Sequence, residues 1–312
     1  MSALSHWPTH TTIRNADPAP GCDVLHPLDA RRCTVQLSTG RLYLDAVAST
    51  ATALLGHDLP LLPATGGSAV ASMLSSLAPG YACVALTSSF PAAIDFAARL
   101  SRSAAGANGR VVEMNAVDGE PANSGDVLVV HENETLGRTG RWLASSAWKR
   151  TADLVVLGEA LALGFPFGAV LARSGHAAGH YPDSAALARV AAAIAAVESE
   201  GLLQQGREVA DYLARRLASL RETCPQIERV EGLGLSIRIA FAPPLEAAQI
   251  RRRMCERGVL VGVDAAGRLA IDPPLPLRIA EADVITGALR GALLSLPMVS
   301  ASPCCPACER GI

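Results

Sequence analysis

The chain has 312 residues, half of them hydrophobic and only 4% aromatic, so aliphatic side chains must form most of a large core. Its formal net charge is -2 and its pI is near 6.4, which excludes the strongly basic surface that nucleic acid or an anionic membrane attracts. We therefore expect a cytoplasmic protein whose partners include neither nucleic acid nor membrane.

The first part of the chain is irregular. Residues 1–34 are rich in Pro, His and Asp without periodicity, and we assign residues 1–39 to an N-terminal arm. The arm lacks the basic stretch followed by an apolar run that marks a secretory signal. Alternating apolar residues over 34–49 predict a β-hairpin with Ser-Thr-Gly at its turn.

Helix and strand patterns then alternate up to about residue 175, which predicts an α/β unit with a mostly parallel sheet. The expected helices cover 66–80 and 91–105, and the expected strands cover 82–89, 110–114, 126–132 and two parts of 152–172. The segment 154–172 is apolar enough to raise the question of a membrane span. Glu159 and the loop-like Gly-Phe-Pro-Phe-Gly stretch favour a buried strand, a loop and a second strand instead.

The remainder begins with two strongly helical patterns and continues as a smaller α+β unit. The expected elements are helices at 183–201 and 202–222, a strand pair at 227–241, a helix at 245–258, strands at 259–264 and 268–271, and a helix at 280–296. We therefore predict a large α/β domain at 40–220, a C-terminal α+β domain at 221–298 and a cysteine-rich tail at 299–312.

Six segments follow one another in an order typical of one enzyme family. They are "GRLYLDAVASTATALLGHDLP" (40–60), "TSSFPAAIDFAARLSR" (87–102), "VLVVHENETLGRTGRW" (127–142), "ADLVVLGEALALGFPFGAVLA" (152–172), "ESEGLLQQGREVADYLARRL" and the C-terminal pattern that ends in "LAIDPPLPL". Over nearly its whole length the chain resembles the class III aminotransferases of the acetylornithine/ornithine group, which are fold-type I pyridoxal-phosphate enzymes of amino-acid metabolism. The resemblance implies their α/β large domain, here truncated around 115–126, and active sites at a dimer interface.

The catalytic positions of that family are changed. By the resemblance, Glu159 stands where the family keeps the lysine that forms an imine with the cofactor, and a carboxylate cannot form that bond. His131 stands where the family keeps the aspartate that pairs with the pyridine nitrogen. Glu132 or Glu134 reaches that place only if the register shifts. Lys149 is the only lysine; it is either a solvated surface residue or a relocated imine lysine.

The phosphate site that the resemblance implies is changed as well. Ser89, Phe90 and Pro91 stand in the turn whose backbone N–H groups hold the phosphate at a helix N-terminus; Phe90 is bulky and Pro91 lacks the donor. Gly179 matches a threonine that reaches the phosphate across the dimer, and Ala270 matches the arginine for the substrate carboxylate. Four lost charge-assisted hydrogen bonds, at ~1.5–3 kcal/mol each, amount to on the order of 6–12 kcal/mol. We expect no bound cofactor; pyridoxal phosphate is implied by the family alone.

Three cysteines crowd the end of the chain, at Cys304, Cys305 and Cys308. Three thiolates can bind a soft metal such as Zn²⁺ or Cu⁺, and a Cys-Pro pair can ligate haem. The spacing is only one half of a typical metal motif, so a tail whose cysteines have no role is the alternative.

Three functional hypotheses follow from the sequence. The first is a catalytically degenerate class III aminotransferase homologue, a pseudoenzyme that acts as a non-catalytic subunit, scaffold or regulator, as a homodimer or as a heterodimer with an active paralogue. The second is an enzyme of altered chemistry on an amino-acid-like substrate, with Glu159 and His131 as an acid–base pair. The third is a metal- or haem-binding protein that acts through its cysteine tail. Whether the chain is an enzyme stays open, but aminotransferase activity is not expected.

Overall fold

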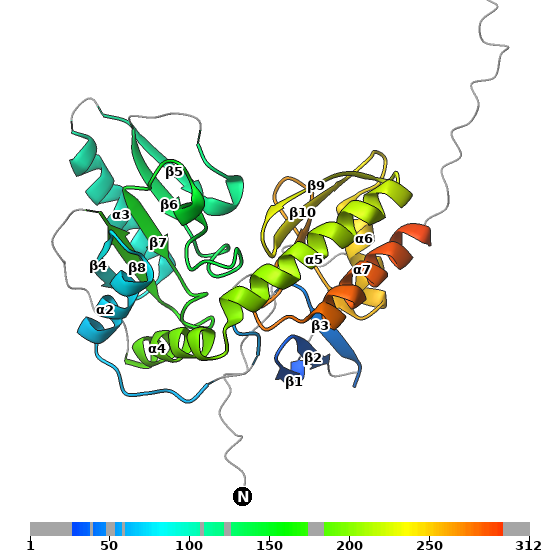
Figure 1. Cartoon of the computed structure of the whole chain (residues 1–312), viewed down its shortest axis with the longest axis horizontal. Coiled ribbons are helices and arrows are strands. Elements are labelled where there is room, and N and C mark those ends of the chain that lie inside the picture. The colour runs from blue at the N-terminus through cyan, green and yellow to red at the C-terminus, as the bar shows by residue number, and fades with distance from the viewer. Residues whose placement is uncertain are drawn as a thin grey trace, which may run out of the picture.

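The long helix α5 (Leu202–Thr223) connects two lobes of the molecule (Figure 1). The computed structural model describes residues 27–37, 40–47, 54–57, 60–106, 109–121, 126–173 and 184–295. Within these residues no helix is long and apolar enough to cross a membrane.

The first lobe is built on a five-stranded sheet with the strand order β4-β8-β7-β6-β5. Its strands are β4 (Ala82–Thr87), β5 (Val111–Asn115), β6 (Val127–His131), β7 (Leu154–Leu157) and β8 (Gly168–Ala172). The pairs β5/β6 and β6/β7 are parallel, whereas β8 runs antiparallel to both β7 and β4. Four of the five strands therefore share one direction, which confirms the predicted mostly parallel sheet.

The apolar segment 154–172 forms the two neighbouring central strands β7 and β8, every residue of which is buried. The prediction of a strand, a loop and a second strand is therefore confirmed, and Glu159 lies in the connecting loop.

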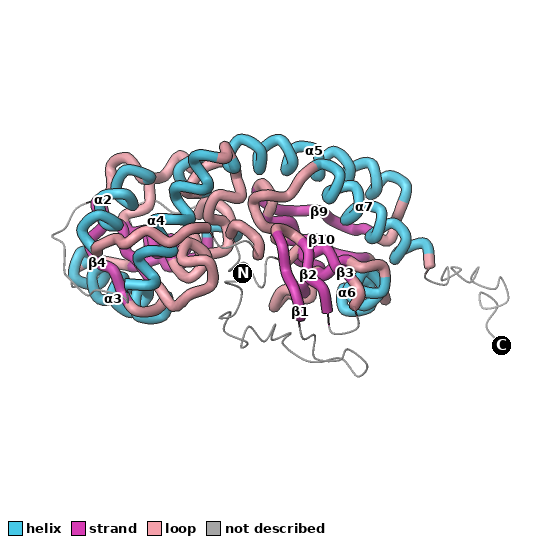
Figure 2. The backbone as a smooth tube through the Cα atoms, turned by 90° about the horizontal axis from the view of Figure 1, so that it is seen from below, coloured by secondary structure: helices cyan, strands magenta, loops and turns pink. Residues whose placement is uncertain are grey.

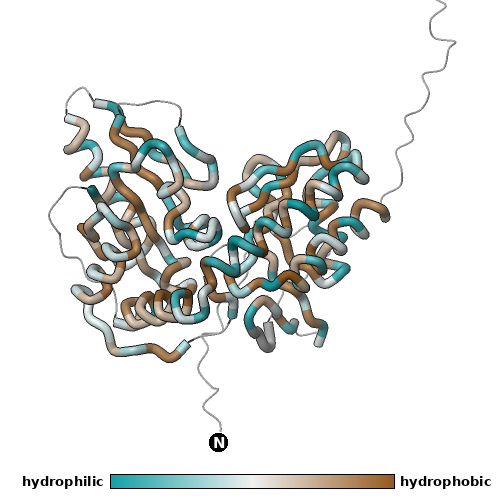
Figure 3. Tube along the Cα trace, in the orientation of Figure 1, coloured by the Kyte–Doolittle hydropathy of each residue, from teal (hydrophilic) through white to brown (hydrophobic). Residues whose placement is uncertain are grey.

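Helices cover both faces of this sheet. They are α2 (Gly67–Leu77), α3 (Phe90–Ala105) and α4 (Ser184–Ser199), and two short 3₁₀ helices, η1 (Ala116–Asp118) and η2 (Ala144–Ala147), lie in the connections. On one face α3 packs its buried Ala93 and Ala97 against Val129, Val156 and other strand residues. Alanine at these positions lets the helix approach closely, so the N-terminus of α3 is held at the edge of the sheet. The central strands are the most hydrophobic part of this lobe (Figure 3).

The second lobe has two small sheets beneath helices. The sheet β12-β13-β10-β9 contains β9 (Ile227–Leu233), β10 (Ser236–Phe241), β12 (Gly262–Val263) and β13 (Leu269–Ile271). Helix α5 packs against β9 and lies side by side with α7 (Ile279–Leu294), and α6 (Ala247–Glu256) packs against α7 (Figure 2). These elements match the predicted α+β pattern.

The predicted N-terminal hairpin belongs by its pairing to the second lobe. The sheet β1-β2-β3-β11 joins β1 (Pro27–Arg31), β2 (Thr34–Leu37) and β3 (Leu42–Asp45) to β11 (Val259–Leu260). The strands β2 and β3 are antiparallel, as predicted, and β3 is parallel to β11. The sequence-based division placed residue 40 and the following residues in the large domain, yet β3 pairs with a strand from 221–298.

Candidate functional site

The residues that the resemblance assigns to the cofactor site lie at one edge of the five-stranded sheet. Ser89 follows the carboxyl end of β4, His131 ends β6, and Glu159 comes shortly after β7. These three strands share a direction, so their carboxyl ends meet at the same edge, where open α/β sheets place their ligands. The helix α3, which begins at Phe90, presents its N-terminus there.

Glu159 is hydrogen-bonded to the first turn of α3. It is partly buried, and its Oε1 accepts the backbone N–H of Phe90 at 3.2 Å. Ser89 is the N-cap of the same helix, and its Oγ accepts the N–H of Ala92 at 3.3 Å. A carboxylate at a helix N-terminus is stabilised by the partial positive charge there, so the contact orients Glu159 toward the helix.

The Phe90 ring lies between the residue before Glu159 and the side chain of His131. It meets the imidazole edge to face, with 5.7 Å between ring centroids and 77° between planes. A Cβ atom added to Gly158 would lie 2.7 Å from Phe90 Cδ2 and 2.7 Å from Asn133 Oδ1. Asn133 Oδ1 in turn accepts the N–H of Ala160 at 3.1 Å, which fixes the start of the loop after β7.

His131 is paired with Glu113 of the neighbouring strand β5. Its Nε2 lies 2.9 Å from Glu113 Oε1, an ion-pair distance, although the ring N–H is not aligned for a hydrogen bond. Burial lowers the pKa of His131, and the Glu113 carboxylate acts in the opposite direction. The largest effect therefore favours a neutral imidazole, which does not supply the anionic partner that a pyridinium needs.

Glu132 and Glu134 would take the place of His131 only if the alignment of this segment with the family shifted. In the structure both side chains have other partners. Glu132 is fully buried, and its carboxylate accepts three hydrogen bonds, from Thr135 Oγ1, Ala144 N and Ser145 N. Glu134 turns toward the second lobe, where its Oε2 lies 3.5 Å from Arg238 Nη2. Glu132 therefore organises the loop after β6, and Glu134 contacts the C-terminal sheet.

Lys149 lies near the opposite edge of the sheet. It is exposed, and its neighbour Arg150 donates a side-chain hydrogen bond to the carbonyl of Asp126, directly before β6 begins. Glu159, in contrast, follows the carboxyl end of β7. The structure thus does not bring Lys149 to the predicted imine position.

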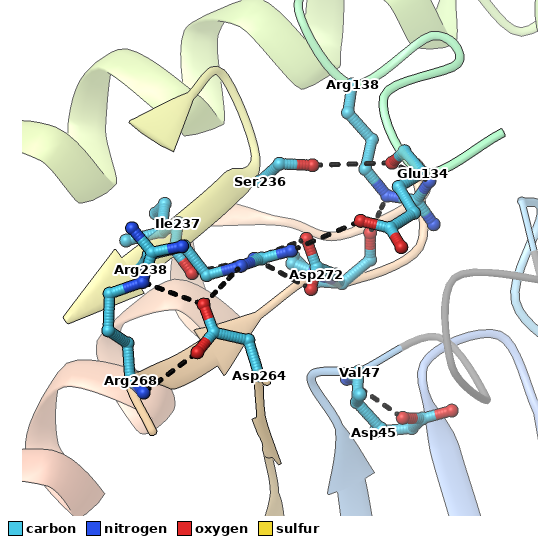
Figure 4. A network of polar contacts seen from close by, with 11 residues as sticks. Asp45, Val47, Glu134, Arg138, Ser236, Ile237, Arg238, Asp264, Arg268 and Asp272 are labelled. Carbon is cyan, nitrogen blue, oxygen red and sulfur yellow. Dashed lines mark hydrogen bonds and ion pairs between the residues drawn. The ribbon is translucent and has the colours of Figure 1, made fainter. Parts of the chain in front are cut away.

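A buried arginine lies beside Ala270, the position that the resemblance assigns to the family's substrate-binding arginine. Ala270 on β13 is paired with Arg238 on β10. Arg238 Nη1 lies 2.9 Å from both carboxylate oxygens of Asp272, and its Nε lies 3.7 Å from Asp264 Oδ2 (Figure 4). Glu134 approaches the same guanidinium. Because three carboxylates surround Arg238, its charge is already balanced within the chain.

Two groups of predicted site residues lie outside the described residues. They are Gly179, assigned to the phosphate site, and the cysteine cluster Cys304, Cys305 and Cys308. Both assignments stay predictions.

The fold of the two lobes is that of the aminotransferases. Ornithine delta-aminotransferase of Plasmodium falciparum aligns with a TM-score of 0.75 over 90% of this chain and 94% of its own, at 16% identity. N-acetylornithine aminotransferase of Stenotrophomonas maltophilia aligns with a TM-score of 0.73 over 88% of this chain and 96% of its own, at 22% identity. These likenesses define the fold.

The sequence defines the family. The model of the family "Aminotransferase class-III" matches residues 120–293, so the chain is a member of the class III aminotransferases. Acetylornithine aminotransferase 1 of Bordetella bronchiseptica is 35% identical over 172 residues, which cover 52% of this chain and 43% of that protein. Acetylornithine aminotransferase of Methanosarcina mazei is 30% identical over 177 residues, which cover 54% of this chain and 44% of that protein. By these matches the chain spans less than half the length of its curated relatives.

Membership of the family implies pyridoxal phosphate, but the residues at this edge do not fit it. The position that the resemblance assigns to the imine-forming lysine carries the carboxylate of Glu159. The N–H of Phe90, which the resemblance assigns to the phosphate turn, is already bonded to Glu159. The Phe90 ring fills the space between Gly158 and His131, the residue that the resemblance assigns to the pyridine nitrogen.

Three residues of the site were not found from the sequence: Glu113, Asn133 and Arg238. A signal for Glu113 existed, since β5 and β6 are parallel with Asn115 opposite His131. Side chains alternate along a strand, so Glu113 and His131 share one face and lie diagonally. Asn133 and Arg238 act through contacts between distant segments, and such contacts leave no local pattern in the chain.

Proposed function

We propose that this chain is a catalytically degenerate class III aminotransferase homologue that acts as a non-catalytic subunit, scaffold or regulator. One observation carries the proposal: Glu159, which stands at the position that the resemblance assigns to the family's lysine, is hydrogen-bonded to the N-terminus of α3. The only lysine of the chain, Lys149, is exposed near the other edge of the sheet. An imine to the cofactor therefore has no amine side chain at the place where the family forms it.

The proposal includes the absence of a tightly held pyridoxal phosphate. The contacts that support it are the Glu159 bond to Phe90 N–H, the pairing of His131 with Glu113 and the balanced charge of Arg238. Each of these groups stands at or beside a position where an active relative needs a free partner for cofactor or substrate.

The proposed partner is a second aminotransferase-like chain, either another copy or an active paralogue. The curated relatives are named acetylornithine aminotransferases, so an enzyme of that kind, acting in the cytoplasm on amino-acid substrates, is the paralogue to test. The resemblance supports this choice, since the family's active sites lie at a dimer interface. Light scattering of the chain alone and mixed with such an enzyme measures the association.

The alternative with an acid–base pair of Glu159 and His131 has less support. Glu159 is bonded to the backbone of Phe90, and His131 packs against the Phe90 ring and pairs with Glu113. Glu159 and His131 therefore each have a partner of their own. The Phe90 ring packs against His131, whereas Glu159 contacts the Phe90 backbone.

Pyridoxal-phosphate titration of the wild-type chain tests the proposal. The expected result is no saturable change in absorbance and, after borohydride reduction, an unchanged intact mass. Peptide mapping separates any adduct on the terminal amine from one on Lys149, and the Lys149→Arg variant is the control. An adduct on Lys149 would contradict the proposal, and so would saturable binding without an adduct.

A further inference from the structure

A cavity of about 360 Å³ lies at the amino edge of the five-stranded sheet. Tyr81, which lines it, directly precedes β4, and its hydroxyl donates a hydrogen bond of 2.7 Å to the carbonyl of Ala152, shortly before β7 begins. The strands β4 and β7 share one direction, since each is antiparallel to β8. Ser89 and Glu159 follow the carboxyl ends of these two strands, so the cavity is separate from the residues assigned to the cofactor site.

The lining of this cavity is mostly apolar. Leu77 and Pro79 come from the end of α2 and the turn after it, and Leu143 comes from the loop after β6. Two aromatic residues, Tyr81 and Trp142, line it from the two sides. Ligand sites in proteins are usually concave and apolar with a few polar groups, and they begin at about 300 Å³. The cavity therefore has the size and the lining of a site for a small ligand.

Bonds within the chain hold both sides of the cavity in place. On one side the N–H of Tyr81 donates to the carbonyl of Ala78 at 3.0 Å, which closes the turn after α2. On the other side the buried Glu132 carboxylate accepts the N–H groups of Ala144 and Ser145 at 3.1 and 2.7 Å. A ligand would therefore meet a site that is already formed and would not have to order it.

Of the described residues that line the cavity, only Arg141 carries a charge. Its side chain is exposed, and within the described part of the chain it has no ion-pair or hydrogen-bond partner. Burial raises the pKa of Tyr81 to about 12, so the phenol stays neutral and does not balance this charge. A guanidinium group matches the geometry of a carboxylate and binds it with two parallel hydrogen bonds.

We infer that this cavity binds a small aromatic carboxylic acid, with its ring against Tyr81 and Trp142 and its carboxylate on Arg141. The charge of Arg141 determines the sign of the ligand, and the apolar lining determines its body. The volume limits the body to about one ring with a short chain. The inference goes beyond the proposed function and does not depend on it, because the cavity lies at the other edge of the sheet.

Calorimetry on the full chain with phenylpropionate as the probe tests the inference. The wild type should show saturable binding, and Arg141→Gln should bind about tenfold more weakly, because the charge-assisted contact is lost. The neutral analogue phenylpropanol should bind the wild type and Arg141→Gln equally. Trp142→Ala should weaken the binding of both probes by similar factors, since it removes part of the apolar wall.

Arg252→Gln on α6 is the matched control, because it removes an exposed arginine outside the cavity and should bind phenylpropionate like the wild type. Circular dichroism establishes that each variant is folded. Should Trp142→Ala fail to fold, the comparison of the two probes on Arg141→Gln decides alone.

Three results would overturn the inference. The first is a wild type that does not bind phenylpropionate, and the second is an Arg141→Gln variant that binds it as tightly as the wild type. The third is acetate that binds as tightly as phenylpropionate, because the apolar cavity would then contribute nothing. A cofactor adduct on Lys149 would overturn the proposed function instead, and it would leave these binding results as they stand.

Discussion

Two glutamates near the carboxyl edge of the sheet show how burial and partners separate the roles of identical side chains. Glu159 is partly buried and stabilises one helix end through a single backbone N–H. Glu132 is fully buried and accepts three hydrogen bonds, at 2.5 Å from Thr135, 3.1 Å from Ala144 and 2.7 Å from Ser145. Burial nevertheless raises the pKa of Glu132, and those hydrogen bonds oppose the rise. Glu159 is bonded to the start of a helix, and Glu132 holds a loop in place.

The raised pKa of Glu132 predicts a pH dependence of stability. Its folded-state pKa lies above the ordinary value of 4.5, so its contribution to the free energy of unfolding is fully present below that value. The contribution is lost as the pH rises through the folded-state pKa. In Glu132→Gln, which has no proton to lose, this part of the pH dependence should disappear.

Urea unfolding at a series of pH values above 4.5 measures the effect. The unfolding free energy of the wild type minus that of Glu132→Gln should decrease as the pH rises. Glu222→Gln, at an exposed position, should keep the wild-type profile. Parallel profiles for the wild type and Glu132→Gln would contradict the prediction.

The loop after β7 determines how closely the start of α3 and the segment after β6 approach it. Gly158 has no side chain, and this lets the Phe90 ring at the start of α3 and the Asn133 side chain after β6 meet the loop. Asn133 also accepts the N–H of Ala160, so the loop is bonded on one side and packed on the other. The φ of Gly158 is not in the left-handed region, so the backbone conformation does not require glycine. The lack of space for a side chain requires it.

Gly158→Ala should therefore destabilise the protein. The new methyl group would lie 2.7 Å from both Asn133 Oδ1 and Phe90 Cδ2, and overpacking of this kind costs about 1–3 kcal/mol. The matched control is Gly287→Ala on the exposed side of α7, where nothing lies within 4 Å of the new carbon. The control should stabilise the helix by roughly 0.5–1 kcal/mol. Denaturant unfolding measures both, and a loss below the experimental error for Gly158→Ala would contradict the crowding.

Charged side chains, of which Arg138, Arg238 and Asp272 are buried, connect the two lobes. Glu134 and Arg138 come from the loop after β6, whereas Arg238 and Asp272 come from the C-terminal sheet. Arg138 is fully buried and donates to the carbonyls of Glu134 and Pro273, so it bonds to both lobes. Burial lowers the pKa of Arg138, and the carboxylates of Asp272 and Glu134 act in the opposite direction.

Replacement of Arg238 should lower the free energy of unfolding. In Arg238→Met, Asp272 would lose its ion-pair partner while still buried, which costs about 3–5 kcal/mol. The control is Arg229→Met on the adjacent strand, whose ion pair with Glu231 has side chains 59% and 42% exposed. The control should change the unfolding free energy by less than about 1 kcal/mol. Urea unfolding compares the two, and equal losses would contradict a special role for the buried pair.

Periodicity and turn residues were enough to predict the elements, because both are local properties of the chain. The segment that contains Glu159 was predicted as two strands and a loop, and β7 and β8 have that arrangement. Position 159 was assigned to the family's lysine because the flanking segments resemble the family, and this assignment stays a prediction. The partners of the site residues were not predictable, since Phe90 and Glu159, or Glu134 and Arg238, are far apart in sequence. Such contacts depend on how distant segments pack in space, which the pattern of either segment does not contain.

The pairing of β3 with β11 has a consequence for synthesis on the ribosome. Leu44 emerges early, yet its strand partner Val259 emerges only when most of the chain has been made. Until then the edge of β3 is unpaired, and an unpaired strand edge is a template for association with other chains. The five-stranded sheet of the first lobe is complete by residue 172, so it can form while β3 still waits. Nascent chains released before residue 260 should therefore hold a formed first lobe beside an aggregation-prone hairpin.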